Sequence, residues 1–363
     1  MGEQLIVTQQ PPPGWVPPGG SAAPPVAGPP PAAPGPYGPA YGHGPQAHKP
    51  GVVALRPLAL GDFFDGAFKT IRRNPGAMVG LAALVTTAFM VVPVLVTLAL
   101  AGLGQLSMGF GTVPATSEDL SAFDSGAVTL ASYLGSFFGL FATVVLNGML
   151  VRVVAEAVLG RRTTAGEAWA AIRGRLLRLV GLLLLDLLLV LLLIGLPVVL
   201  GFAVGMQVGV AAGFLVGVPL LLLAVAAIAF VQVRYFQLAA PALVLERMGV
   251  LASLRRAGQL SRGQFWRILG ILLLTGLVAA VVGQVVSVPL TLLGAAGPLF
   301  FPGTGGALLL VLTSYLAQVV VGSLTTPFTA AVTALQYVDQ RIRKEGLDVE
   351  LIAASRPGPA GPR

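Results

Sequence analysis

The sequence predicts an all-α integral membrane protein with six transmembrane helices in three hairpins, each preceded by an amphipathic interfacial helix, and a disordered Pro-rich N-terminal tail. Composition supports this class, because 55% of the 363 residues are hydrophobic and only 10% are charged, against roughly 25% charged in soluble domains. The placement of charge supports it as well. All 22 Lys and Arg residues precede the first long apolar segment or follow the second, fourth or last one.

This distribution of basic residues also predicts a topology. The loops on the opposite side contain only Glu118, Asp119 and Asp124 as charged residues. Retained loops are enriched in Lys and Arg while short translocated loops are depleted, so both termini are expected in the cytoplasm. The preference for Arg over Lys, with abundant Ala, Gly and Pro, is typical of a GC-rich bacterial genome and favours the bacterial plasma membrane. Topology and anionic headgroups explain the basic excess, and no nucleic-acid partner is expected.

The chain divides into a tail and a membrane domain. Residues 1–50 hold 15 of the 29 prolines, a composition that cannot bury a core and favours disorder with polyproline II character. This tail is interpreted either as a solvated spacer or as a docking segment for a protein partner that recognises proline. The membrane domain is predicted over 51–340, and residues 341–363 form a C-terminal cytoplasmic tail.

Six apolar segments are long enough to cross a bilayer. A helix rises about 1.5 Å per residue, so roughly 20 apolar residues span the hydrocarbon core. The spans are predicted at residues 77–103, 127–151, 177–197, 207–233, 268–294 and 306–333.

The third and fourth spans share one long apolar stretch. Between Arg178 and Arg234 the only charged residue is Asp186, and we expect a turn near Pro197. After that turn, glycines recur at a spacing of four, which gives a helix a smooth face for close packing. The candidate packing residues are Gly209, Gly213 and Gly217. They pack either within the chain or between two copies of it, as a homo-oligomer.

Three repeat units organise the membrane domain. In each unit an arginine lies eight residues before a glycine at the start of a span (Arg72 and Gly80, Arg173 and Gly181, Arg262 and Gly270). An amphipathic segment precedes each of these spans, at residues 62–73, 164–176 and 250–259. The spacing of apolar and charged side chains in these segments is that of a surface helix.

Several motifs resemble a known family. They include Arg56-Pro57-Leu58 and Arg72-Arg73-Asn74-Pro75 near the start, Phe265-Trp266-Arg267, and Glu345-Gly346-Leu347-Asp348 near the end. Over roughly 55–352 the chain resembles the glycerophosphoryl diester phosphodiesterase membrane domain and related bacterial membrane proteins. In the enzymes of that name, a separate soluble domain follows the membrane part and hydrolyses the phosphodiester. No such domain follows the last span here, so the resemblance implies a membrane module without the enzyme's activity.

The sequence shows no catalytic constellation, so an enzyme is not expected. Cysteine is absent, and both histidines, His43 and His48, lie in the tail. The membrane domain therefore lacks the commonest metal ligands and proton shuttles. No metal and no cofactor is expected.

Asp186 is the leading candidate functional residue. It lies eight residues beyond Arg178, or roughly 12 Å along a helix, where a carboxylate is costly unless it is paired, protonated or hydrated. The expected polar partners within the membrane are Asn147, Gln284 and Gln318, or an arginine that reaches in from the end of a span. This group is interpreted either as a structural polar clamp or as a proton or ligand site.

Two classes of function follow from these features. The first is a non-enzymatic membrane scaffold or regulator that contacts anionic lipids and recruits partners at its cytoplasmic face. Its candidate headgroup contacts are Arg72, Arg73, Arg173, Arg255, Arg256 and Arg262. The alternative is a small-solute or lipid transporter that uses Asp186. Broken helices often line substrate sites in transporters, and here interruptions are expected at Pro93, Pro197, Pro219 and Pro289.

Overall fold

The structure is a computed structural model that describes residues 51–53, 56–109, 117–301 and 304–346. The predictions for residues 1–50 and 347–363 lie outside these ranges. Within them every regular element is helical, which confirms the all-α class. In chain order the elements are α1 (Leu60–Arg73), the π-helix η1 (Gly76–Gly80), α2 (Leu81–Gly109), α3 (Ser117–Val158), α4 (Ala165–Arg173), α5 (Leu176–Val208), α6 (Val210–Val231), the π-helix η2 (Gln232–Phe236), α7 (Ala239–Leu245), α8 (Val250–Leu260), α9 (Phe265–Ala295), α10 (Gly297–Phe300) and α11 (Thr304–Glu345).

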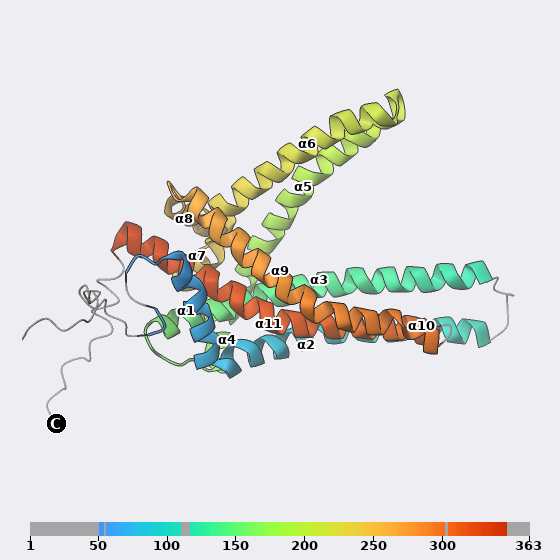
Figure 1. The fold of residues 1–363 in the computed structure, drawn as a ribbon, viewed down its shortest axis with the longest axis horizontal. Helices are drawn as coiled ribbons and strands as arrows, with labels where there is room; N and C mark the ends of the chain where they lie inside the picture. Colours follow the sequence, from blue (N-terminus) through green and yellow to red (C-terminus); the bar gives the residue numbers. More distant parts are fainter. Residues whose placement is uncertain (1–50, 54–55, 110–116, 302–303, 347–363) are drawn as a thin grey trace, which may run out of the picture. The chain divides into compact units, whose positions relative to one another are not determined.

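Six helical segments in the described ranges are long and apolar enough to span a membrane, as predicted. They are Gly76–Leu100, Ser132–Val158, Leu176–Val208, Val210–Leu245, Phe265–Ala295 and Leu308–Glu345. Successive spans pack in pairs, α2 with α3, α5 with α6, and α9 with α11. The short helices α1, α4 and α8 precede these three hairpins (Figure 1). The chain is therefore built from three hairpins that each follow a short helix.

Local sequence explains where the short helices begin and end. At the start of α1, Asp62 Oδ2 accepts a hydrogen bond from the Ala59 N–H at 2.9 Å, and Pro75 follows the end of the helix. At α4 a reciprocal capping box is present: the Glu167 N–H donates to Thr164 Oγ1 at 3.3 Å, and the Thr164 N–H donates to the Glu167 carboxylate at 2.9 Å. Each contact satisfies a backbone N–H that the helix leaves free.

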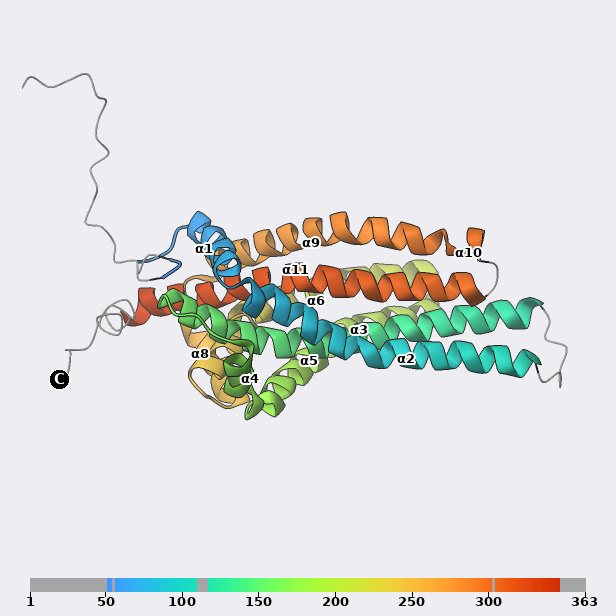
Figure 2. The same ribbon diagram turned by 90° about the horizontal axis from the view of Figure 1, so that it is seen from below.

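Helix α11 is the centre of the packing. It contacts α9, α3, α2 and α1, and both views show it among these helices (Figures 1 and 2). Its buried residues Ala331 and Leu335 belong to the largest hydrophobic cluster, together with Phe63 of α1. Phe328 of α11 also stacks on Phe64, with ring centroids 5.9 Å apart. The apolar face of α1 is thus covered by the last span.

The turn between the third and fourth spans lies at Gly209, and the predicted turn near Pro197 is wrong. Pro197 lies inside α5, and Pro93, Pro219 and Pro289 also lie inside continuous helices, so the predicted interruptions at these prolines are wrong as well. Opening the backbone at membrane depth would expose unpaired polar groups, while a membrane helix tolerates proline. Gly209 has a φ of 127°, a conformation that glycine adopts without a steric penalty.

Several glycines lie at the contact between α5 and α6, the two helices of the second hairpin. A Cβ atom on Gly201 of α5 would lie 2.9 Å from the Cα of Gly217, and one on Gly213 of α6 would lie 2.6 Å from the Gly201 carbonyl oxygen. Gly213 and Gly217 therefore pack within the chain, whereas Gly209 forms the turn, so its predicted packing role is wrong. Apart from α5, helix α6 contacts mainly the adjoining η2.

Candidate functional site

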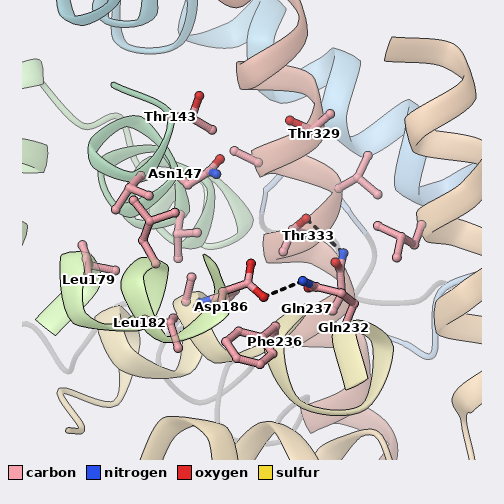
Figure 3. Close-up of a pocket in the computed structure, with 18 of the residues that line it drawn as sticks. Thr143, Asn147, Leu179, Leu182, Asp186, Gln232, Phe236, Gln237, Thr329 and Thr333 are labelled. Carbon is pink, nitrogen blue, oxygen red and sulfur yellow. Dashed lines mark hydrogen bonds between the residues drawn. The ribbon is translucent and has the colours of Figure 1, made fainter. Parts of the chain in front are cut away.

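A polar cavity lies where the three hairpins meet. It has a volume of about 390 Å³ and is lined by α3 from the first hairpin, α5, η2 and α7 from the second, and α9 and α11 from the third. Figure 3 shows polar side chains from α3, α5, η2 and α11 directed toward one another in this space. Most of the lining is aliphatic, so the few polar groups define its chemistry.

Asp186 is the only ionisable residue in the lining of this cavity. It projects from α5 and accepts a hydrogen bond from Gln232 Nε2 at 2.5 Å (Figure 3). Gln232 is the first residue of the π-helix η2. Such wide turns inside membrane or soluble helices occur frequently at functional sites. This π-helical turn of the fourth span thus lies at the site, and it brings a glutamine to the carboxylate.

The other side of the cavity presents amide and hydroxyl groups. The Asn147 side chain of α3 faces the cavity (Figure 3), and none of the described residues forms a hydrogen bond with it. Gln237 Nε2 donates to Thr333 Oγ1 at 3.3 Å and to Gln336 Oε1 at 3.0 Å. Unlike the Gln237 amide, the Asn147 amide retains its donors and its acceptor for a ligand or water.

Threonine hydroxyls complete the polar lining. Thr143 Oγ1 donates to the Gly139 carbonyl at 2.9 Å, and Thr275 Oγ1 donates to the Ile271 carbonyl at 2.6 Å. Because each hydroxyl donates to its own helix, its oxygen remains an acceptor toward the cavity. Together with the carboxylate, the cavity offers more acceptors than donors.

The structure brings together only part of the predicted polar group. Asp186 and Asn147 line the same cavity. Gln284 lies elsewhere on α9, where its Oε1 accepts from Ser287 Oγ at 3.4 Å in an exposed position. Gln318 lies beside Gly135 of α3, whose added Cβ would be 3.1 Å from Gln318 Nε2.

Sequence reasoning missed the partners Gln232 and Gln237. Both flank Arg234 at the end of the fourth span, where polar residues are typical of the membrane interface. In the structure Gln232 of the π-helix donates to Asp186, while Gln237 lines the same cavity and donates to Thr333 and Gln336. Two glutamines five residues apart beside an apolar span were the available signal.

The predicted headgroup arginines fall into two groups. Arg72, Arg73, Arg173, Arg255 and Arg262 are exposed.

Arg256 is instead held in an ion-pair network. Its guanidinium contacts Glu246 at 2.9 Å and Glu345 at 2.5 Å. Burial disfavours the charge of Arg256, but hydrogen bonds to Glu345 and Glu246 outweigh it and raise its pKa above the ordinary value. Glu345 lies on α11, and so does Tyr337, which donates a hydrogen bond to Glu246. Arg256 therefore ties α8 to the end of α11 rather than facing lipid.

In the described part of the chain, no group of three or more His, Cys, Asp or Glu side chains could hold a metal ion. The fold and the cavity define a multi-pass membrane protein with a polar site among its spans. More particularly, residues 58–340 match the family described as a domain of unknown function, DUF7847, and the chain belongs to that family. No curated protein and no solved structure matches the chain. The resemblance to the glycerophosphoryl diester phosphodiesterase membrane domain stays a prediction.

Proposed function

We propose that the chain is a non-enzymatic protein of the bacterial plasma membrane, with both termini cytoplasmic, that carries a small solute or a lipid bearing a cationic group through the Asp186 cavity. The observation that carries this proposal is that one carboxylate is the only ionisable group lining a polar cavity among apolar spans.

The free energy of a lone carboxylate supports a ligand. A charged aspartate at the centre of a membrane helix costs about 3 kcal/mol on insertion scales. One hydrogen bond from Gln232 offsets about 0.5 to 2 kcal/mol of that cost, the range for hydrogen bonds between membrane helices. A bound proton or a ligand ammonium group removes the remaining penalty, and the acceptor-rich lining suits a ligand that donates hydrogen bonds.

The position of the cavity supports movement as well as binding. It lies between the repeat units, which is where many secondary transporters place their substrate sites, and beside the π-helical turn η2. Each hairpin contributes one wall, so a shift of one hairpin against the others would change access to Asp186.

The test isolates the charge of Asp186. The full chain is extracted with its surrounding lipid in copolymer particles, and the co-purified solutes and lipids are quantified by mass spectrometry. Asp186→Asn keeps the size and an acceptor for Gln232, so the fold is expected to persist, while a cationic species falls by about tenfold or more. Gln284→Leu is the matched control, because it removes a polar side chain of a span outside the cavity. Equal amounts of the same cationic species in the wild type and in Asp186→Asn would contradict the proposal and favour the interpretation of Asp186 as a structural polar clamp.

The scaffold hypothesis is a second candidate. It is favoured by the five exposed arginines named above, which suit contact with anionic headgroups. Its recruitment step depends on the tail at residues 1–50, and a cross-linked pull-down with and without those residues tests it. An unchanged set of partners after deletion of the tail would remove its main support.

A further inference from the structure

A second cavity, of opposite charge, is lined by residues within one helical turn of those that line the first. Its volume is about 610 Å³. The first cavity is lined by Val151, Leu179 and Pro241, and the second by Arg152, Arg175 and Val244 on the same helices or at their ends. Five arginines line it, Arg152, Arg161, Arg162, Arg175 and Arg247.

The carboxylates of this second cavity do not balance its arginines. Glu156 is shared between Arg152, at 2.6 Å, and Arg161, at 3.8 Å. Glu167, the other acidic residue in the lining, accepts the backbone N–H that begins α4. With five guanidinium groups and two carboxylates, the lining has an excess of three positive charges.

Arg175 and Arg247 carry that excess most clearly. Neither forms an ion pair with a carboxylate in the described ranges, and Arg175 Nη1 instead donates to the Ala171 carbonyl at 2.6 Å. Burial, and then the charges of Arg247, Arg178 and Arg152, lower the pKa of Arg175 below its ordinary value. Crowded cations without counter-charges are the arrangement found where an anion binds.

The backbone at Arg247 supports the same conclusion. Its φ of 58° makes it the only non-glycine residue at positive φ in the part of the chain that the structure describes. It directly follows the C-cap residue of α7, a position where glycine is favoured because a Cβ atom is disfavoured there. Glycine would fit the backbone at position 247 better than arginine. We therefore attribute the presence of arginine there to its guanidinium group.

We propose that this arginine-lined cavity binds a phosphate group. Guanidinium groups recognise phosphate oxygens through paired, charge-assisted hydrogen bonds. The chemistry fits the phosphate of a lipid headgroup and that of a free phosphate ester. The site is separate from the Asp186 cavity, and its ligand has the opposite charge.

Two probes distinguish the two sources. Dioleoyl phosphatidic acid carries a phosphate monoester on two acyl chains, and glycerol 3-phosphate carries the same group without them. Native mass spectrometry of the full chain in detergent gives the occupancy of phosphatidic acid against phosphatidylcholine, and calorimetry gives the affinity for glycerol 3-phosphate. Binding of both assigns a site for the phosphate itself, and binding of phosphatidic acid alone assigns a lipid site.

Three variants separate the site from general charge. Arg247→Gly removes the guanidinium and relieves the backbone, so the protein keeps its fold while affinity falls about tenfold, the equivalent of one charge-assisted hydrogen bond. Arg162→Gln is a second variant on an exposed loop and is expected to weaken binding in the same direction. Arg56→Gln, the matched control, makes the same change in charge at an exposed residue outside the cavity and leaves affinity within about twofold. The proposal is overturned if neither probe binds above phosphatidylcholine, or if Arg56→Gln weakens binding as much as Arg247→Gly.

Discussion

The backbone N–H of Leu58 donates to Oδ1 of Asp339 at 2.8 Å, across 281 residues of sequence. Asp339 is fully buried, accepts from Arg343 Nε at 3.0 Å and lies 3.2 Å from Arg267 Nη2. Both arginines also donate to the Leu58 carbonyl. The first residue of the family domain is thereby fastened to its penultimate one.

Loss of that carboxylate should be strongly destabilising. Asp339→Ala leaves two partly buried guanidinium groups without their counter-charge, and breaking such a network typically lowers the free energy of unfolding by about 3 to 5 kcal/mol. Thermal unfolding of the purified protein measures the effect. Asp65→Ala is the control, because the exposed pair of Asp65 with Lys69 is worth less than about 1 kcal/mol. An equal loss of unfolding free energy in both variants would show that the Asp339 network stabilises the fold no more than an exposed ion pair does.

The hydrogen bond between Asp186 and Gln232 should appear as a coupling energy. Single and double replacements by leucine form a double-mutant cycle, and we expect a coupling of about 0.5 to 2 kcal/mol, the range of hydrogen bonds between membrane helices. Unfolding in denaturing detergent gives the four free energies. A coupling energy of zero would mean that the hydrogen bond from Gln232 to Asp186 does not stabilise the protein.

The hairpin of α5 and α6 should resist added volume at Gly213. Gly213→Val places a Cβ atom 2.6 Å from the Gly201 carbonyl oxygen, so the helices must separate, at a cost of about 1 to 3 kcal/mol. Gly195→Val is the control within α5, because a Cβ atom there would meet nothing within 4 Å. Unfolding measured by loss of helical circular dichroism should separate the two variants, and similar curves would contradict the packing.

The absence of cysteine makes the predicted topology simple to test. Leu299, at the end opposite the arginines, is 82% exposed, and Ala165 is exposed at the start of α4. On intact cells, a membrane-impermeant maleimide should label Leu299→Cys and should label Ala165→Cys only after permeabilisation. The reverse pattern would invert the proposed orientation.

Features that depend on local composition were predicted well from the sequence. The six spans, the three short helices and the capping box at Thr164 and Glu167 follow from apolar length, helical spacing and neighbouring residues. The turn at Gly209 was missed because proline usually ends a helix in a soluble protein but is tolerated inside a membrane helix.

The site was predicted only in part. Asp186 and Asn147 could be selected because polar residues are costly inside a span. Which other side chains reach them depends on how the hairpins are rotated, and on the extra residue that a π-helical turn inserts at Gln232. No pattern along the chain gives that rotation, so Gln284 and Gln318 could not be separated from the true neighbours.

The packing partners of α11 also bear on how the protein is made. The hairpin of α5 and α6 depends mainly on contacts within itself and can assemble soon after both helices enter the bilayer. Helices α2 and α3 can also pair with each other, but the faces of α1, α2 and α3 that α11 covers have no partner until α11 follows them in the chain. During translation the earliest part of the membrane domain therefore stays open until the ribosome has completed α11, and that interval is when a membrane chaperone or protease would encounter it.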